Sequence, residues 1–315
     1  MNIIEFGDCR ETMRRWAACG VKAQTCVTSP PYFGLRDYGH PDQLGLEQTP
    51  EQYIAAMVEV FRCVRDVLAD DGTLWVNIGD SYAGGGGGNY SKGTRNNSGQ
   101  NITNVRNRQD WLSETGLKPK DLIGIPWMLA FALRADGWYL RQDIIWNKPN
   151  PMPESVRDRC TKAHEYIFLM SKSERYFFDS EAMREDSVKG AAGSSFNTGK
   201  TAAHQLGRSS DAERRDDGKR NRRSVWSVAT VPYKGAHFAT FPPALIEPCI
   251  LAGSRPGDVV LDPFMGSGTT AAVALRHGRR YVGCELNPEY LPLQQSRMEE
   301  MAMPLFDAAQ TIHER

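Results

Sequence analysis

The chain has 315 residues, enough for one α/β domain with insertions or for two small domains, and its 38 Lys and Arg residues balance 38 Asp and Glu residues. Because the formal net charge is zero, the overall charge gives no support for nucleic-acid binding, and any such argument must rest on local clusters of basic residues. Seven cysteines without a C-x-x-C pair favour reduced thiols over a disulfide framework or a zinc site, and no metal is predicted. Without a signal-like N-terminus or an apolar run of about 18 residues, we expect a cytoplasmic protein outside the membrane.

Strand and helix patterns alternate over the first part of the sequence. Strands are predicted at residues 2–8, 24–28 and 73–78, and helices at 11–18 and 53–68. Pro50 and Asp71-Gly72 bound the longer helix. Residues 84–110 then break all periodicity with five glycines followed by polar and basic residues. This insertion is either a solvated loop or a mobile arm that orders on a polyanion.

The second part of the sequence returns to the same alternation after a basic insertion. A helix at 125–133 and two strands at 139–146 and 165–170 precede residues 190–223, of which 208–223 hold seven Arg and Lys residues against four acids. The remaining predicted elements are helix 242–251, buried strand 258–262, helix 269–277, strand 280–285 and helix 288–301. This alternation predicts an α/β fold with a doubly wound, mostly parallel sheet.

A stiff corner, Thr28-Ser29-Pro30-Pro31-Tyr32, follows the second predicted strand. Each proline lacks an N–H group and fixes φ, and the residue before a proline avoids the helical region, so neither a strand nor a helix continues. The corner presents a hydroxyl, backbone carbonyls and an aromatic ring. Such oxygens accept hydrogen bonds from an exocyclic amino group, and the ring stacks on a flat π face. A structural loop with no ligand is the alternative interpretation.

A glycine-rich turn, Asp262 to Gly268, follows the buried strand 258–262. Gly266-x-Gly268-x-x-Ala271 fits G-x-G-x-x-G/A, which permits a tight turn and a close approach of the backbone to a ligand. Glu285 ends the next strand, where a carboxylate accepts hydrogen bonds from ribose hydroxyls. By itself this pattern also fits a nicotinamide dehydrogenase. Asp262, however, would repel a pyrophosphate yet pair with an ammonium group, and Phe264 offers a face to a cation.

Together the corner and the turn resemble the amino-group DNA methyltransferases, whose pattern is a [DNS]-P-P-[YF] corner plus a glycine-rich S-adenosylmethionine turn. The order here, corner first and turn last, is similar to the β group of that family. The resemblance implies a Rossmann-like fold with a mostly parallel seven-stranded sheet, one reversed strand and a circularly permuted motif order. We assign the reversed pair to strands 139–146 and 165–170 and expect the first strand of the chain beside the last.

The resemblance also implies the roles of individual residues. It assigns catalysis to Ser29, Pro30, Pro31 and Tyr32, with S-adenosylmethionine as methyl donor and no metal. The implied cofactor-binding residues are Asp262, Pro263, Phe264, Gly266, Gly268, Glu285, Asp8, Phe238 and Thr240. Asp8 follows a glycine at a strand end, and such an Asp can equally be a helix cap.

Double-stranded DNA is the expected partner, and its target base must be flipped out to reach the corner. The basic insertion and the proline-stiffened loop after strand 139–146 offer candidate DNA contacts: Arg214, Arg215, Arg220, Arg222, Arg223 and Lys148. A solvated charged loop is the alternative for the insertion. In the resembled family a Ser at the first corner position is most often found with N4-cytosine enzymes, so Ser29 favours cytosine over N6 of adenine.

These expectations divide the chain into three parts. Residues 1–185 form the catalytic half of one methyltransferase domain, residues 186–224 are a candidate target-recognition segment, and residues 225–315 form the cofactor-binding half. We expect a monomer or a homodimer near the nucleoid, with a cognate restriction endonuclease as a further candidate partner. Two alternatives from other classes stay open, a nicotinamide-dependent dehydrogenase and a non-catalytic DNA-binding module.

Overall fold

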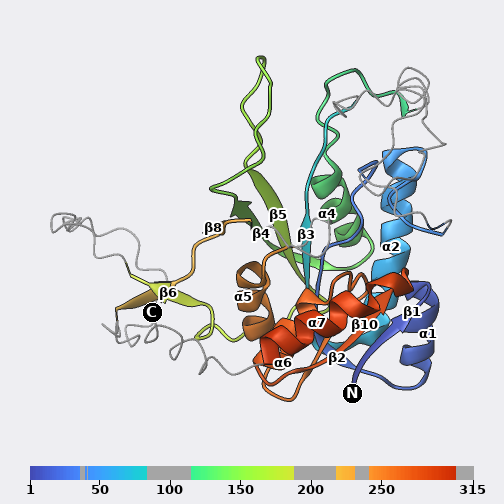
Figure 1. The fold of residues 1–315 in the computed structure, drawn as a ribbon, viewed down its shortest axis with the longest axis vertical. Helices are drawn as coiled ribbons and strands as arrows, with labels where there is room; N and C mark the ends of the chain where they lie inside the picture. Colours follow the sequence, from blue (N-terminus) through green and yellow to red (C-terminus); the bar gives the residue numbers. More distant parts are fainter. Residues whose placement is uncertain (36–39, 41, 84–114, 188–217, 231–240, 303–315) are drawn as a thin grey trace, which may run out of the picture.

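A single large sheet organises the molecule in the computed structural model, which describes residues 1–35, 40, 42–83, 115–187, 218–230 and 241–302. Figure 1 shows the sheet between two layers of helices. Its strand order is β1 (Asn2–Phe6), β10 (Arg280–Glu285), β9 (Val259–Asp262), β2 (Ala23–Thr28), β3 (Leu68–Ile78), β5 (His164–Ser171), β4 (Tyr139–Asn147) and β8 (Val225–Ser227). Neighbouring strands are parallel except at β5, which runs against both β3 and β4.

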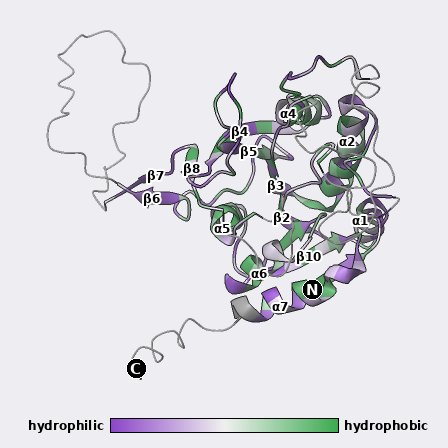
Figure 2. Ribbon diagram, turned by 45° about the horizontal axis from the view of Figure 1, so that its top comes forward, coloured by the Kyte–Doolittle hydropathy of each residue, from purple (hydrophilic) through white to green (hydrophobic). Residues whose placement is uncertain are grey.

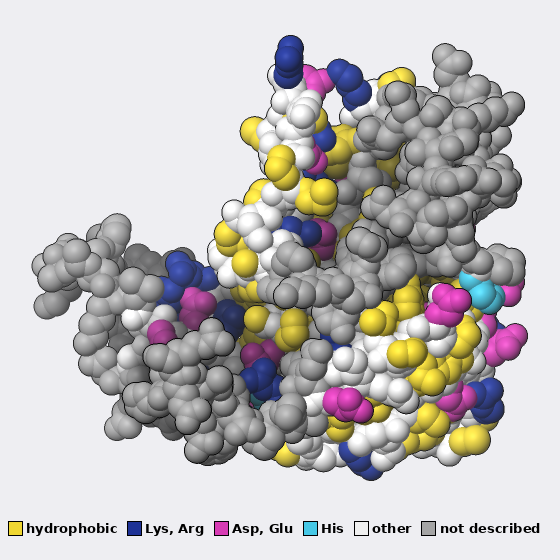
Figure 3. All heavy atoms as spheres, in the orientation of Figure 1, with side chains coloured by type: hydrophobic (Ala, Val, Ile, Leu, Met, Phe, Trp, Pro, Cys, Tyr) yellow, Lys and Arg dark blue, Asp and Glu magenta, His cyan; other side chains and the backbone are white. Residues whose placement is uncertain are grey.

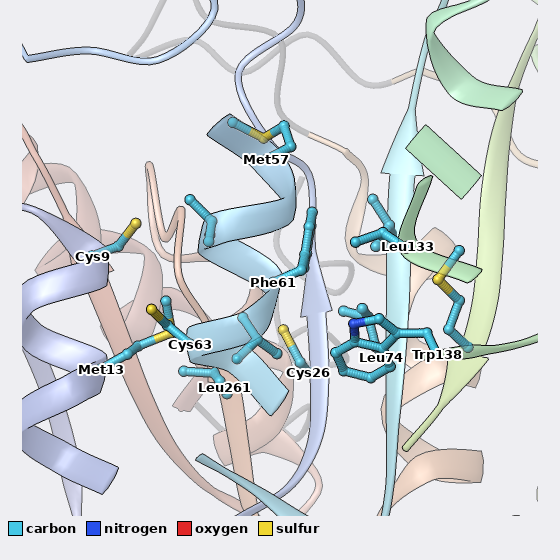
Figure 4. Close-up of a cluster of buried hydrophobic side chains, with 14 of the residues drawn as sticks. Cys9, Met13, Cys26, Met57, Phe61, Cys63, Leu74, Leu133, Trp138 and Leu261 are labelled. Carbon is cyan, nitrogen blue, oxygen red and sulfur yellow. The ribbon is translucent and has the colours of Figure 1, made fainter. Parts of the chain in front are cut away.

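Each face of the sheet is covered by its own set of helices. One core contains α1 (Cys9–Ala18), α2 (Pro50–Val67) and α4 (Ile125–Ala135), and the other contains α5 (Pro243–Gly253) and α6 (Thr269–Arg276). Successive side chains of a strand point to opposite faces of the sheet, so each strand contributes to both cores. Cys26, for example, faces the α2 side and Val27 faces the α5 side. Figure 4 shows Phe61 of α2 between residues of α1 and of the sheet. A short 3-10 helix η1 (Pro288–Tyr290) and α7 (Leu291–Ala302) follow β10.

Local chemistry explains where the helices begin. Thr49 caps α2 by accepting a hydrogen bond from the Gln52 amide at 3.3 Å, and Pro50 occupies the first turn, where its missing N–H costs nothing. Asp8 caps α1 by accepting from the Arg10 amide at 2.7 Å. Because Asp8 follows β1 by two residues, its cap fixes the start of α1 close to the end of that strand.

The two ends of the chain meet in the sheet, as the sequence predicts. β1 pairs in parallel with β10, with Asn2 opposite Tyr281 and Phe6 opposite Glu285. β2 pairs with β9, so the strand before the proline corner lies beside the strand before the glycine turn. The sheet is therefore continuous and Rossmann-like, even though the proline corner precedes the glycine turn in the sequence.

Three expectations about the strands need correction. The sheet has eight strands rather than seven, because Val225–Ser227 adds a short edge strand that pairs with β4 and places Trp226 opposite Trp146. Only β5 of the expected reversed pair is reversed, while β4 runs with the other strands. β3 begins at Leu68 rather than at residue 73, and the β2–β3 register shifts between Ala23 and Thr25.

A second, two-stranded sheet stands apart from the main one. β6 (Arg184–Asp186) pairs in antiparallel fashion with β7 (Lys219–Asn221), and both strands are hydrophilic in Figure 2. None of the described helices is both long enough and apolar enough to cross a membrane.

Candidate active site

The predicted site residues gather at one edge of the sheet. β1, β10, β9 and β2 are parallel, so their carboxyl ends share an edge, and Asp8, Glu285, the glycine turn and Ser29 follow or end these strands in that order. A cavity of about 190 Å³ opens there. Among the residues that line it, the sequence predicted Asp8, Ser29, Pro30, Pro31, Tyr32, Pro263, Phe264, Gly266 and Glu285.

The proline corner forms one wall of this cavity. β2 ends at Thr28, and the chain then turns away from the sheet through Pro30 and Pro31. The Pro31 carbonyl accepts a hydrogen bond of 2.8 Å from the Tyr53 hydroxyl of α2. A buried helix side chain therefore braces the corner from behind.

The Tyr32 side chain is held through its hydroxyl group. Its ring lines the cavity, and its hydroxyl donates to Glu165 Oε2 at 2.7 Å. The Asn77 amide donates to the same oxygen at 3.2 Å. Burial, followed by the nearby Glu165 charge, raises the pKa of the Tyr32 hydroxyl well above its usual value. The phenol therefore stays protonated and serves as a hydrogen-bond donor.

Glu165, which the sequence analysis did not single out, connects the corner to the loop after β4. Its Oε1 accepts from the Lys148 ammonium, which also lies 4.3 Å from the centre of the Trp146 ring. The Lys148 and Glu165 side chains are 19% and 16% exposed, so the predicted DNA contact Lys148 is largely committed to this pair. An acid at the second position of an apolar strand was the signal that could have identified Glu165.

Close packing around Tyr32 depends on a glycine. A Cβ atom at Gly79 would lie 2.8 Å from Tyr32 Cε2 and 3.2 Å from Glu165 Cγ. Gly79 follows β3, so the absence of a side chain there lets the tyrosine ring and the glutamate approach the strand end.

The glycine turn forms the opposite wall, with Gly266 at φ 53° and Gly268 at φ 83°. The Gly266 amide donates to Glu285 Oε2 at 2.7 Å, and the Asn287 amide donates to Oε1 at 2.9 Å. Glu285 lines the cavity but is only 8% exposed, and burial raises the pKa of its carboxyl. Gly268 lies at the start of α6 and is not among the lining residues.

Asp262 lies beneath the turn rather than in the cavity wall. Its carboxylate is 1% exposed and accepts from the Thr28 and Thr270 hydroxyls at 2.6 and 2.7 Å and from the Phe264 amide at 3.0 Å. Burial raises the pKa of this carboxyl to about 6. Asp262 therefore ties β2, β9 and α6 together, and its expected pairing with a ligand ammonium group stays a prediction.

Asp8 is a helix cap that also lines the cavity, and its role as a cofactor ligand stays a prediction. A side-chain hydrogen bond from Arg10 lowers the pKa of the Asp8 carboxyl, so the group remains ionised at the cavity rim.

Two of the three described candidate DNA-binding arginines already form ion pairs. Arg220 and Arg223 donate to Glu185 Oε1 at 2.9 and 3.2 Å, and the Arg222 guanidinium lies 5.3 Å from the Trp226 ring centre. They lie in or beside the β6–β7 hairpin, and none of them lines the cavity. Arg214, Arg215, Phe238, Thr240 and the glycine-rich insertion lie outside the described residues. Within the described ranges no cluster of three or more His, Cys, Asp or Glu residues could hold a metal ion.

Comparison with known proteins shows which family the chain belongs to. The N6_N4_Mtase family, described as DNA methylase, matches residues 23–296. The chain is 49% identical to the Type II methyltransferase M.Cfr9I of Citrobacter freundii, over 93% of this chain and 86% of the relative. It is 48% identical to the Type II methyltransferase M.SmaI of Serratia marcescens, over 94% and 90% of the two chains.

Solved structures share the fold at lower identity. The PvuII DNA methyltransferase (cytosine-N4-specific) superposes with a TM-score of 0.60 at 19% identity and covers 96% of this chain and 90% of its own. TTHA0409, a putative DNA modification methylase from Thermus thermophilus complexed with S-adenosyl-L-methionine, superposes with a TM-score of 0.56 at 24% identity and covers 96% of both chains.

Proposed function

The chain belongs to the family of N6/N4 DNA methylases, and on that premise we propose that it transfers a methyl group from S-adenosylmethionine to the exocyclic amino nitrogen of a flipped base in double-stranded DNA, with N4 of cytosine favoured. One observation carries this proposal. The proline corner and the glycine turn, more than two hundred residues apart in the chain, line the same cavity. Family membership also decides against the dehydrogenase and the non-catalytic binder as alternatives.

The residues of the cavity fit S-adenosylmethionine. Glu285 offers a carboxylate at a strand end, where ribose hydroxyls can donate to it, and Phe264 offers an aromatic face to a sulfonium cation. Ser267 lines the cavity, and its buried Oγ has no hydrogen-bond partner among the described residues, which suits a polar ligand atom. When bound, this cofactor supplies an electrophilic methyl group.

The corner acts on the nucleophile. An exocyclic amine on an aromatic base is a poor nucleophile because its lone pair is delocalised into the ring. Hydrogen bonds from the amine to the Ser29 hydroxyl and the Pro30 carbonyl favour a pyramidal nitrogen whose lone pair is free. Tyr32 stacks against the flipped base, and holding both reactants in place contributes about 7–11 kcal/mol in favourable cases.

A covalent mechanism through cysteine finds no support in the cavity. Cys9 is the one cysteine among the lining residues, and burial raises the pKa of its thiol to about 12. Cys249, which follows Pro248 in α5, is fully buried, and burial raises the pKa of its thiol strongly. Neither thiol is available as the thiolate that nucleophilic attack on a base would need.

Nuclease digestion of treated DNA, followed by mass spectrometry of the nucleosides, tests the target base. Unmethylated DNA incubated with the protein and S-adenosylmethionine should yield N4-methylcytosine. N6-methyladenine would move the reaction to the alternative base, which a neutral Ser29 hydroxyl can also serve. The appearance of no methylated nucleoside, with folded protein and a positive control enzyme, would overturn the proposal.

The remaining roles follow from a DNA substrate. We place the activity in the cytoplasm at the nucleoid, propose a monomer or homodimer, and propose a cognate restriction endonuclease because the relatives are named Type II methyltransferases. Sequencing the methylated positions of the host genome maps the recognition site. Resistance of that DNA to an endonuclease encoded nearby would support the pairing, and unprotected sites would contradict it.

A further inference from the structure

A projecting loop rises from the same edge of the sheet as the cavity. We call residues 149–163, between β4 and β5, the finger. Because β4 ends and the reversed β5 begins at that edge, the finger leaves the sheet at the same edge as the corner, with β3 and β5 between the ends of β2 and β4, and a bond of 2.8 Å from the Lys148 amide to the Ala163 carbonyl closes its base. In Figure 1 it stands above β4 and β5 as the light-green hairpin at the top of the view.

The finger is braced by polar contacts along its length. The Asn150 side chain donates to the Thr230 carbonyl at 3.0 Å and accepts from the Thr230 amide at 2.9 Å. Glu154 Oε2 accepts from Arg159 Nη1 at 2.6 Å, and the Arg159 guanidinium lies 3.9 Å from the Tyr82 ring centre. A 15-residue connection held in this way has a defined shape, which is unusual for a loop of its length.

Met152 is presented on this braced loop between Pro151 and Pro153. It is 86% exposed, the highest value among the large apolar side chains that the structure describes as exposed. The flanking prolines fix their own φ angles and restrict Met152, so its backbone has little freedom to fold the side chain back onto the protein. The chain thus holds a flexible, polarisable apolar side chain in solvent, as binding surfaces often do.

Charge and connection indicate what meets this side chain. Arg157, Arg159 and Lys162 outnumber Glu154 and Asp158 on the finger, which leaves a net charge of +1, and Figure 3 shows cationic side chains at its outer end. The base of the finger is connected to the corner through Glu165, which accepts hydrogen bonds from both Lys148 and Tyr32. Its partner should therefore combine negative charge with apolar layers, as the phosphates and stacked bases of a duplex do.

We propose that Met152 is a wedge that enters the base stack of bound DNA beside the base taken into the cavity. Apolar side chains such as Met and Pro unstack base steps in this way in other DNA-binding proteins. The reach is sufficient, since four extended residues from Lys148 to Met152 span about 13 Å, against groove depths of about 7.5–8.5 Å. The inference rests on the proposed DNA methylation but concerns how the base leaves the stack.

Mispaired DNA provides the sharpest test. A mispaired target base costs less to extrude, so a wedge matters less for it. With a duplex that carries the mapped methylation site, M152A should lower methyl transfer about tenfold or more when the target base is paired and less than about twofold when it is mispaired. M152L, which keeps the apolar bulk, should retain most of the transfer. V225A, at a 58% exposed apolar residue of β8, is the matched control and should behave as wild type on both duplexes.

A fluorescence measurement separates failure of the wedge from failure of the proposed function. A duplex with pyrrolocytosine, a fluorescent cytosine analogue that pairs with guanine, at the target position brightens when that base leaves the stack, whether or not a methyl group is transferred. M152A should reduce this rise, while wild-type and V225A proteins should keep it. Equal losses of M152A on paired and mispaired DNA, or an unchanged fluorescence rise, would overturn the wedge even if the enzyme methylates DNA.

Discussion

Thr28 and Asp262 lie 234 positions apart in the chain, yet the Thr28 hydroxyl donates a 2.6 Å hydrogen bond to the Asp262 carboxylate. The bond joins the strand before the proline corner to the strand before the glycine turn. Both residues are at most 1% exposed, so water cannot replace the interaction. The hydrogen bond therefore fixes the positions of the two halves of the candidate site relative to each other.

Replacing Thr28 with valine should weaken this connection. T28V keeps the side-chain shape but leaves a buried carboxylate without one of its three donors, so we expect the free energy of unfolding to fall by about 1–3 kcal/mol. Denaturant titration measures the change. T28S keeps the hydroxyl and should remain closer to wild type; a T28S loss as large as that of T28V would show that the methyl group, not the bond, matters.

The raised pKa of Asp262, about 6, makes stability depend on pH. The unfolded carboxyl titrates near 3.8, so between about pH 4 and pH 6 the folded state binds more protons than the unfolded state. Stability from this group should therefore fall as pH rises through that window and level off above it, by a few kcal/mol at most.

Unfolding measurements across pH 4–7 on wild type and D262N check this expectation. The difference in unfolding free energy between the two proteins should shrink as pH rises to about 6. D70N, which removes a carboxylate whose side chain is 97% exposed, is the control and should keep the wild-type pH profile. A constant difference between wild type and D262N would contradict the raised pKa.

The contact between Tyr32 and Glu165 predicts coupled effects on catalysis. E165Q weakens the charged acceptor of the Tyr32 hydroxyl, and Y32F removes the donor but keeps the ring. Because a hydrogen bond to a charged group contributes about 1.5–3 kcal/mol, each change should lower kcat about tenfold or more, with little change in the KM for S-adenosylmethionine. The double variant should lose less than the sum of the two single losses, because both changes act on the same hydrogen bond, although Glu165 also accepts from Lys148 and Asn77. Fully additive losses would mean that Tyr32 and Glu165 act independently.

The arginines beside the β6–β7 hairpin should contribute to DNA affinity through phosphates. R220A/R223A should weaken binding at low salt and reduce the slope of log K against log salt by about 2, because each phosphate contact contributes about 0.9. E185A, which removes the present acceptor of both arginines, should strengthen binding. R134A on α4 is the control. Equal salt slopes for wild type and R220A/R223A would remove these residues from the interface.

Local patterns were sufficient for much of the fold. The apolar stripe of α2, the buried strand β9 and the turn glycines at 266 and 268 each follow from neighbours in the sequence, because helix and strand periodicity and positive φ angles are local properties. The pairing of β1 with β10 was expected from the family resemblance and not from local periodicity. The direction of β4 could not be predicted, because strand direction depends on partners far away in the sequence. The edge strand β8 could not be predicted either, because its three residues carry no periodic signal.

Adjacent residues were enough to predict a stiff proline corner and a glycine-rich turn, because the backbone restrictions of proline and glycine are intrinsic. Only the tertiary structure decided which side chains meet them. It buried Asp262 under the turn, brought Glu165 to the Tyr32 hydroxyl and paired two of the predicted DNA-binding arginines with Glu185. Such contacts join residues far apart in the chain, and their geometry exists only once the strands have been ordered in the sheet.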